Sequence, residues 1–322
     1  MTVLVTGASG MLGREVALEL LRGGHRVRVL QRGPSALTDV EEVRGSITDA
    51  AVVESATDGV DAVVHLAAKV SLAGDPAEFE RVNVAGAEVV LDAAETAGVS
   101  RFVHISSPSV AHGGSALVGV GAEPADPGAA RGEYARTKAQ GELLALARDR
   151  RGFAVVAVRP HLVWGPGDPQ LVERIVDRAR RGRLPLLDDG TALIDSTYVA
   201  NAASAIAAAL EHAETAHGRA FVVTNGEPRP VGELLAGICR AAGVQPPAFS
   251  VPAGVARAAG GLVERLWSIR PGADEPPMTR FLAEQLSTAH WFDQRQTRAA
   301  LHWTPTVSID EGLERLAAHY RA

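Results

Sequence analysis

The chain has 322 residues, of which 46% are hydrophobic and 22% charged, and its formal net charge is −6. This composition excludes a disordered chain, and the acidic balance argues against nucleic acid as a partner. The single cysteine, Cys239, excludes a disulfide framework and a cysteine-rich metal site. No apolar run is long enough to span a membrane, and the N-terminus lacks the basic start of a signal peptide. We therefore expect a cytoplasmic globular protein of one large or two smaller domains.

Strand and helix patterns alternate through the first half of the chain. Apolar runs predict strands at residues 3–5, 27–30, 40–44, 61–66, 101–105 and 153–158. Helical periodicity predicts helices at residues 11–22, 49–57, 77–97 and 133–150. This alternation is typical of βαβ units with right-handed crossovers, and it indicates an α/β fold with a Rossmann-type doubly wound parallel sheet.

The alternation loosens after about residue 160. Helices are expected at residues 171–181, 231–242 and 310–320. A strand near 220–223 is expected to return to the sheet, and residues 190–200 are a second candidate for such a strand. We therefore predict a dinucleotide-binding domain at 1–160 and, in 161–322, mainly a smaller C-terminal substrate-binding cap. Residues 195–201 are expected to fold this cap. The apolar stretch 251–267 favours a helix hairpin lining a pocket, the alternative being a membrane-surface contact.

Three glycines follow the first strand and open the first helix, with the spacing G-x-x-G-x-x-G. The first permits a tight turn, the second lets the backbone approach a pyrophosphate, and the third lets helix and strand pack closely. The helix N-terminus then offers free N–H groups and a positive dipole end. An ordinary βα turn is the alternative. The expected cofactor contacts of this turn are Gly7, Ser9, Gly10, Met11, Leu12 and Gly13.

The end of the second strand indicates which cofactor is preferred. An acidic residue usually holds the ribose 2′-hydroxyl of NAD about 20 residues beyond the glycines. Residues 29–33 instead read Val-Leu-Gln-Arg-Gly, with Arg32 at that place and no acidic residue in the segment. An arginine can pair with a 2′-phosphate through its bidentate fork. We therefore expect NADP(H), with NAD(H) as the alternative cofactor, and with a solvated loop arginine as the alternative role of Arg32.

Tyr134 and Lys138 lie four residues apart in a predicted helix, so their side chains share one face. The chain has only three tyrosines and two lysines, which makes this spacing hard to reach by chance. An ammonium beside a phenol is expected to lower the phenol's pKa, so that tyrosine can exchange a proton with a carbonyl oxygen while hydride is transferred. Ser106 or Ser107, at the end of the fifth strand, could supply a second hydroxyl.

Taken together, these residues resemble the extended short-chain dehydrogenase/reductase family. The resemblance spans nearly the whole chain. Its motifs are the glycine turn at 6–13, 61–68 (DAVVHLAA), 83–86 (NVAG), 105–107 (ISS), the Tyr134/Lys138 pair, 158–166 (VRPHLVWGP), 292–293 (FD), 301–305 (LHWTP) and 311–313 (EGL). Segments 106–111 (SSPSVA) and 165–170 (GPGDPQ) are similar to the 3β-hydroxysteroid dehydrogenase-like branch, which includes sterol 4-carboxylate 3-dehydrogenases and 2-alkyl-3-oxoalkanoate reductases.

The resemblance implies a catalytic trio of Ser107, Tyr134 and Lys138. It also implies cofactor contacts beyond the glycine turn, at Arg32, Ser46, Ile47, Leu66, Ala67, Ala68, Tyr134, Lys138, Pro160 and Leu162. Ser46 departs from the family pattern, in which many members carry Asp there. Asn83 is expected to be structural, Lys69 is a further candidate for the site, and a homodimer is the family-level expectation.

The expected activity is that of an NADP(H)-dependent oxidoreductase interconverting a ketone and a secondary alcohol on a hydrophobic 3-oxo or 3-hydroxy acid or a sterol-like molecule. The alternatives are a nucleotide-sugar epimerase or dehydratase with bound NAD, and a non-catalytic cofactor-binding protein. Arg32 argues against the first and the Tyr134/Lys138 pair against the second. The histidine spacings fit no metal motif, so no metal is expected. Candidate partners for a substrate carboxylate are Arg159, Arg174 and Arg183.

Overall fold

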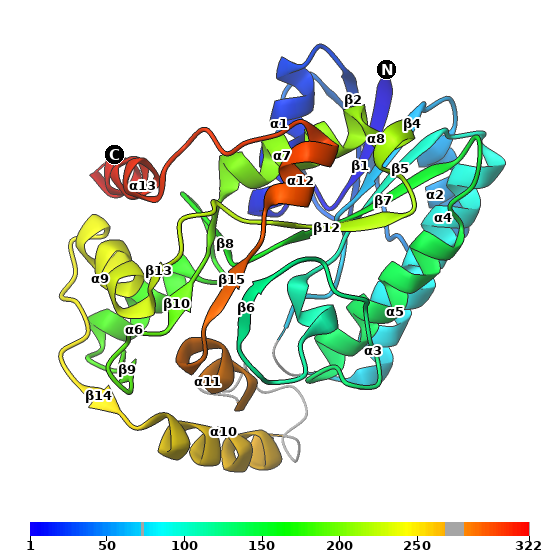
Figure 1. Ribbon diagram of the computed structural model, residues 1–322. Coiled ribbons are helices and arrows are strands. Elements are labelled where there is room, and N and C mark those ends of the chain that lie inside the picture. Colours follow the sequence, from blue (N-terminus) through cyan, green and yellow to red (C-terminus); the bar gives the residue numbers. More distant parts are fainter. Residues whose placement is uncertain (72–73, 268–279, 322) are drawn as a thin grey trace.

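A seven-stranded parallel sheet forms the centre of the computed structural model, which describes residues 1–71, 74–267 and 280–321 (Figure 1). The strand order is β12-β7-β5-β4-β1-β2-β3, and every neighbouring pair is parallel. The order turns back on itself at β1 and β4, as in a doubly wound fold. The predicted fold class is therefore confirmed. The strands are β1 (Thr2–Thr6), β2 (Arg26–Gln31), β3 (Val40–Arg44), β4 (Ala62–His65), β5 (Arg101–Ile105), β7 (Ala154–Pro160) and β12 (Arg219–Val223).

Helices cover both faces of this sheet and bury a separate apolar cluster on each. Because both faces are covered, the strands are apolar almost throughout rather than alternating. One face is packed by α1 (Met11–Arg22), α7 (Val199–Glu211), α8 (Ala213–Ala216) and α12 (Arg295–Leu301). The other face is packed by α2 (Ala50–Thr57), α4 (Gly86–Thr96) and α5 (Glu133–Ala147).

A second, four-stranded sheet of order β13-β10-β15-β6 stands beside the central sheet, at the carboxyl ends of its strands (Figure 1). Its strands are β6 (Leu117–Val120), β10 (Leu193–Ile194), β13 (Arg229–Pro230) and β15 (His290–Phe292). The predicted helices of this part are confirmed as α6 (Val172–Arg180), α9 (Val231–Ala241) and α13 (Ile309–Arg321), which share an apolar cluster around Trp164. Two short parallel pairs join β8 (Val163–Trp164) to β11 (Thr197–Tyr198) and β9 (Leu186–Leu187) to β14 (Ser250–Val251).

Three expectations about these elements need correction. The helix expected at 77–97 is interrupted by a wider π turn, η1 (Arg81–Ala85), between α3 (Pro76–Glu80) and α4. The second candidate strand at 190–200 does not join the central sheet, because β10 pairs with β13 and β15 and β11 pairs with β8. Residues 199–201 begin α7, where Val199 packs in the cluster around Trp164 and the following turns pack on α1 and the central sheet. The stretch 251–267 is a single helix, α10 (Ala253–Trp267), whose partner is the later helix α11 (Arg280–Ser287).

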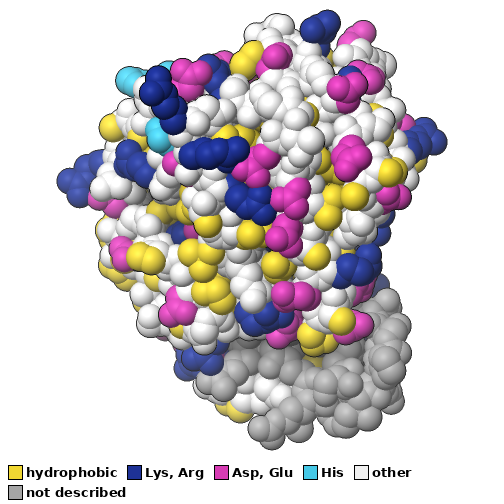
Figure 2. Space-filling model, turned by 90° about the vertical axis from the view of Figure 1, so that its right-hand side faces the viewer, with side chains coloured by type: hydrophobic (Ala, Val, Ile, Leu, Met, Phe, Trp, Pro, Cys, Tyr) yellow, Lys and Arg dark blue, Asp and Glu magenta, His cyan; other side chains and the backbone are white. Residues whose placement is uncertain are grey.

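The outer surface mixes charges of both signs. Figure 2 shows the face that carries α4 and α5, where basic and acidic side chains alternate over the surface. Arg148 illustrates this pattern, since its guanidinium contacts Asp92 at 2.7 Å and Glu95 beside it. Within the described ranges, every helix is too short or too polar to cross a membrane.

Candidate active site

The glycine turn between β1 and α1 is packed so closely that two of its positions require glycine. Gly7 has φ +78°, and a Cβ there would lie 3.0 Å from the backbone of Ala67. A Cβ on Gly13 would lie 2.3 Å from the carbonyl oxygen of Gly7. The third glycine therefore lets α1 begin directly against the first strand, as the spacing predicted.

Gly10 differs from its neighbours because it faces open space. A Cβ on Gly10 would lie 3.7 Å from the Gly7 carbonyl oxygen. Apart from its own chain neighbours, it would meet no other heavy atom of the described residues within 4 Å. The first helical hydrogen bond runs from the Arg14 N–H to the Gly10 carbonyl at 2.9 Å, so the N–H groups of Met11, Leu12 and Gly13 precede the helical ladder. This arrangement fits the pyrophosphate of a dinucleotide.

Thr6 holds the end of β4 against this turn. Its hydroxyl oxygen accepts hydrogen bonds from the N–H groups of Leu66 at 3.1 Å and Ala67 at 3.0 Å. Leu66, Ala67 and Ala68 are all half-buried at the carboxyl edge of the sheet. The structure thus brings this predicted segment beside the glycines.

Arg32 lies directly after β2, exposed to solvent, and it forms no hydrogen bond or ion pair with another described residue. An acidic residue that no local pattern in the sequence indicates also lies beside this loop. Glu42 comes alongside because β3 pairs with β2, and its carboxylate accepts hydrogen bonds from Ser35 at 2.7 and 2.8 Å and lies 3.5 Å from Gln31 Nε2. The Ser35 hydrogen bonds, with the Arg44 guanidinium, lower the pKa of Glu42 to about 2.

Ser46 and Ile47, two of the predicted cofactor contacts after β3, are held by local contacts. The Ser46 hydroxyl lies 2.8 Å from the Thr48 hydroxyl. Ile47 is buried, and a Cβ on Gly86 would lie 2.9 Å from its Cδ1. Ser46 is only half-buried and stays near the surface after β3.

Tyr134 lies in the first turn of α5, next to Ser107 at the end of β5. Burial raises the pKa of the Tyr134 phenol, and an interaction with the Ser107 hydroxyl acts in the opposite direction. Ser107 caps the short 3₁₀ helix η2 (Pro108–Ala111), and its oxygen accepts a hydrogen bond from the Ser109 hydroxyl at 2.9 Å. The other candidate, Ser106, is buried and its hydroxyl finds no hydrogen-bond partner among the described residues.

Lys138 lies on the same face of α5, one turn farther on. Its Nζ donates a hydrogen bond to the carbonyl oxygen of Ile105 at the end of β5. Burial lowers the pKa of the Lys138 ammonium to about 8. The expectation that this ammonium lowers the pKa of Tyr134 is wrong for this arrangement, because burial outweighs the other influences on the phenol and the lysine points to the strand.

Asn83 ties the loop after β4 to helix α5. Its Oδ1 accepts a hydrogen bond from the Lys69 N–H at 2.7 Å, and its Nδ2 donates to Thr137 Oγ1 at 3.0 Å. The residue is buried within the π turn η1, and both ends of its side-chain amide are engaged by these contacts. Lys69 itself turns away, with its Nζ 2.6 Å from Glu78 Oε2.

The three arginines predicted as candidate partners for a substrate carboxylate lie in different surroundings. Arg159 is buried, with its Nε 2.8 Å from Glu142 Oε2, so the expectation that it binds a substrate carboxylate is wrong. Arg174 lies on α6 with its Nη2 2.9 Å from Gln170 Oε1, and Arg183 is exposed.

Pro160 and Leu162 flank the end of β7, where Pro160 pairs with Val223 and Leu162 has φ +41°. Between them, His161 is buried, with its Nδ1 2.8 Å from the Asp195 carbonyl oxygen.

Three histidines from distant segments meet beside β7, which the sequence did not reveal. The ring of His290 lies 4.8 Å from His112 and 6.0 Å from His161, centroid to centroid. Burial lowers the pKa of His161 to about 4 and of His290 to about 3. Among the described residues, no three His, Cys, Asp or Glu side chains are arranged to hold a metal ion.

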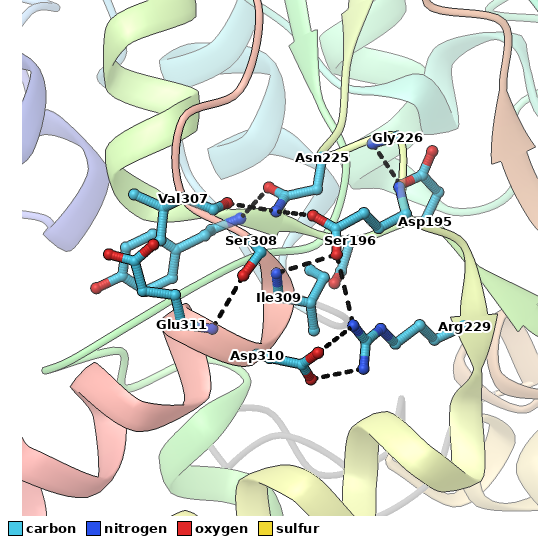
Figure 3. A network of polar contacts seen from close by, with 12 residues as sticks. Asp195, Ser196, Asn225, Gly226, Arg229, Val307, Ser308, Ile309, Asp310 and Glu311 are labelled. Carbon is cyan, nitrogen blue, oxygen red and sulfur yellow. Dashed lines mark hydrogen bonds and ion pairs between the residues drawn. The ribbon is translucent and has the colours of Figure 1, made fainter.

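A polar network braces the wall between the two sheets (Figure 3). The Asp195 carboxylate accepts hydrogen bonds from Thr224 Oγ1 at 2.7 Å and from the Gly226 N–H at 3.0 Å. Asn225 donates to the Val307 carbonyl at 2.9 Å. Arg229 forms a bidentate pair with Asp310 at 2.7 and 2.8 Å. These contacts join residues 224–229, which follow β12, to Asp195 and to residues 307–310 near the C-terminus, so we assign the network to structure.

The glycine turn at the start of α1 and the Ser107, Tyr134 and Lys138 side chains at the carboxyl edge of the sheet are together typical of an oxidoreductase of the extended short-chain type. The chain belongs to the NAD dependent epimerase/dehydratase family, whose model matches residues 3–224.

Individual proteins to which the chain is similar support the same family assignment. The chain is 40% identical to the 2-alkyl-3-oxoalkanoate reductase of Stenotrophomonas maltophilia, over 99% of each chain. It is 30% identical to the 3 beta-hydroxysteroid dehydrogenase/Delta 5-->4-isomerase of Mycobacterium tuberculosis, over 99% of this chain and 90% of the relative. It is also similar to the crystal structure of the DesIV dTDP-glucose 4,6-dehydratase double mutant from Streptomyces venezuelae with NAD and DAU bound, with a TM-score of 0.75, 26% identity and coverage of 100% and 97%. The suspected family and branch are thus confirmed.

Proposed function

We propose that the protein is an NADP(H)-dependent oxidoreductase that interconverts a ketone and a secondary alcohol on a hydrophobic 3-oxo or 3-hydroxy acid, or on a sterol-like molecule. The observation that carries the proposal is the convergence of Ser107, Tyr134 and Lys138 at one edge of the sheet. The relative that is 40% identical over the full length is named for a 3-oxoalkanoate substrate, which supports an acid.

In this proposal Tyr134 gives a proton to the substrate's carbonyl oxygen. Because burial raises the pKa of its phenol, the side chain stays protonated near neutral pH and can act as a donor during reduction. The Ser107 hydroxyl, already beside the phenol, donates a second hydrogen bond to the same oxygen. Lys138 carries its charge below about pH 8 and, one turn beyond Tyr134 on α5, can donate a hydrogen bond to the ribose of the bound nicotinamide nucleotide. The bound nicotinamide supplies the hydride.

Two features support NADP(H). Arg32 is exposed at the end of β2 and free to reach a 2′-phosphate. Glu42, a carboxylate beside the same loop, accepts hydrogen bonds from Ser35 rather than from Arg32, so it leaves the guanidinium available. We also propose that residues 1–160, with β12, bind the cofactor, and that 161–322 mainly form the cap over the substrate.

A nucleotide-sugar reaction is the second candidate. It is supported by the similarity to a solved dTDP-glucose 4,6-dehydratase with bound NAD. Such a reaction returns its hydride to the substrate, so the enzyme would hold NAD tightly and show no net cofactor oxidation.

The two candidates are separated by measuring NADPH and NADH oxidation with 3-oxo acids, ketosteroids and sugar nucleotides. We expect turnover with NADPH and a hydrophobic 3-oxo acid. In Arg32→Glu, kcat/KM for NADPH should fall about 100-fold or more while the value for NADH changes little, because the reversed charge repels only the 2′-phosphate. Turnover of sugar nucleotides alone would defeat the proposal, and an equal loss for both cofactors would remove Arg32 from its role.

A further inference from the structure

Helix α5 carries three ionisable side chains at every fourth position on one side: Tyr134, Lys138 and Glu142. The site described above uses the first two. Glu142 lies one turn beyond Lys138 and is 1% exposed, and Lys138 is 4% exposed. An ammonium removed from water to this degree loses most of its hydration, so the surroundings decide whether the lysine keeps its proton.

Glu142 is held rigidly by a strand of the central sheet. Arg159 on β7 donates from both Nε and Nη2 to the Glu142 carboxylate, with the Nε bond at 2.8 Å, and its Nη1 donates to the Glu123 carbonyl oxygen at 2.7 Å. Both side chains of this pair are almost fully buried. Buried pairs seldom stabilise a fold more than apolar side chains of the same size, so stability alone is a weak reason for placing one here.

Besides the groups on α5, ionisable side chains on β4, β5 and β7 surround Lys138. His65 on β4 and His104 on β5 are buried and neutral near pH 7, because burial holds the pKa of each far below its usual value. Arg159 reaches the cluster through its pair with Glu142. The charge of Glu142 raises the pKa of Lys138 and so opposes the effect of burial.

We propose that Glu142, clamped by Arg159, is a positioning residue that keeps the buried Lys138 side chain charged and directed at the carbonyl oxygen of Ile105. The proposal rests on the function assigned to Lys138 above. It concerns the charge of one side chain in the folded protein, however, so it can be tested without any substrate.

The composition of the chain makes a direct measurement practical. Lys69 and Lys138 are the only lysines, so protein labelled with 13C at the lysine Cε gives two lysine signals, and Lys69→Arg assigns them. In Glu142→Gln the midpoint of the Lys138 titration should fall by about one pH unit, a tenfold lower ratio of ammonium to amine at a given pH. An unchanged midpoint would overturn the proposal.

Two controls separate charge from packing. Glu142→Asp keeps the charge and should keep the midpoint near the wild-type value although it disturbs the contact with Arg159. Glu133→Gln removes an ion-paired but half-exposed carboxylate from the same helix, and the midpoint should not move. If the midpoint falls equally in Glu142→Asp, packing alone explains the effect and the proposal fails.

Glu142→Gln leaves Arg159 buried without its partner and can unfold the protein. The double variant Glu142→Leu with Arg159→Met removes both charges at similar volume and should fold. Because the Glu142 charge raises the pKa of Lys138 directly and Arg159 reaches the cluster through Glu142, the midpoint should still fall below the wild-type value, by less than in Glu142→Gln. A midpoint at or above the wild-type value in the folded double variant contradicts the proposal. Loss of 3-oxo acid turnover has no part in this readout, so a wrong function and a wrong role of Glu142 remain distinguishable.

Discussion

Tyr134 and Lys138 share a helix face, but the fold gives them different partners. The phenol meets Ser107 at the end of β5, whereas the lysine Nζ turns to the carbonyl oxygen of Ile105. Their i, i+4 spacing could be read from the sequence because helical geometry alone dictates it. Their pKa directions could not, because burial by neighbouring strands decides them.

At this scale the first prediction concerns proton transfer. Tyr134→Phe removes the hydroxyl and leaves the ring volume nearly unchanged, so we expect kcat for NADPH oxidation to fall by about 100-fold to 10,000-fold, as loss of a general acid does. Binding of NADPH, followed by fluorescence titration, should stay within about threefold of wild type. Unchanged turnover would remove Tyr134 as the acid.

Other contacts of the site could not be predicted from the sequence. Glu42 meets the loop after β2 only because β3 pairs with β2 in register, and His112, His161 and His290 meet only after β15 has joined the second sheet. Long-range pairing of this kind leaves no local pattern in the chain. The pairing of Arg159 with Glu142 leaves no local pattern either, because Glu142 lies on the facing helix.

At the scale of elements, the connection between β1 and α1 is the most tightly constrained feature. The place of a Gly13 Cβ lies 2.3 Å from the Gly7 carbonyl oxygen and 3.0 Å from the Ala8 Cα, and both of these are backbone atoms that cannot turn aside. The strand, the turn and the helix start were predicted correctly here, because glycine spacing and apolar periodicity are local signals.

We therefore predict that Gly13→Ala displaces α1 from β1. The expected loss in the free energy of unfolding is about 1–3 kcal/mol, as for overpacking elsewhere, together with weaker cofactor binding. Urea unfolding and NADPH titration check the two effects. The matched control is Gly261→Ala in the interior of α10, where a Cβ meets nothing within 4 Å and alanine should raise stability by about 0.5–1 kcal/mol. Equal stability of the two variants would contradict the steric argument.

At the scale of the whole molecule, several histidines are buried in neutral form. Burial lowers the pKa of His65 and His290 to about 3 and of His161 to about 4, against about 6.5 in an unfolded chain. The unfolded state then binds more protons below pH 6.5. Stability is complete above that pH and is lost as the pH falls toward 4. Asp195 acts in the opposite sense, because burial raises its pKa to about 6 and its contribution to stability is lost as the pH rises through that value.

The histidines outnumber this carboxyl group, so we predict a net loss of stability between pH 6.5 and 4, of up to about 1.4 kcal/mol per pH unit for each histidine. Both ring nitrogens of His112 are buried, and neither has a hydrogen-bond partner among the described residues. Burial lowers the pKa of His112 as well. His112→Phe should therefore fold and lose less stability on acidification than wild type. Urea unfolding from pH 7.5 to 4.5 checks this, and parallel slopes for wild type and His112→Phe would refute the prediction.

The second sheet draws its four strands from stretches that lie far apart along the chain: β6 comes before α5, β10 after β7, β13 after β12, and β15 close to the C-terminus. Between these visits the chain returns to the central sheet to add α7 and β12. The substrate specificity of a relative cannot be transferred by replacing one continuous segment, because the other strands of the second sheet would then lack their pairing partners. Altered substrate specificity should instead arise from small changes within each of these stretches, which leave the connections between the two sheets unchanged.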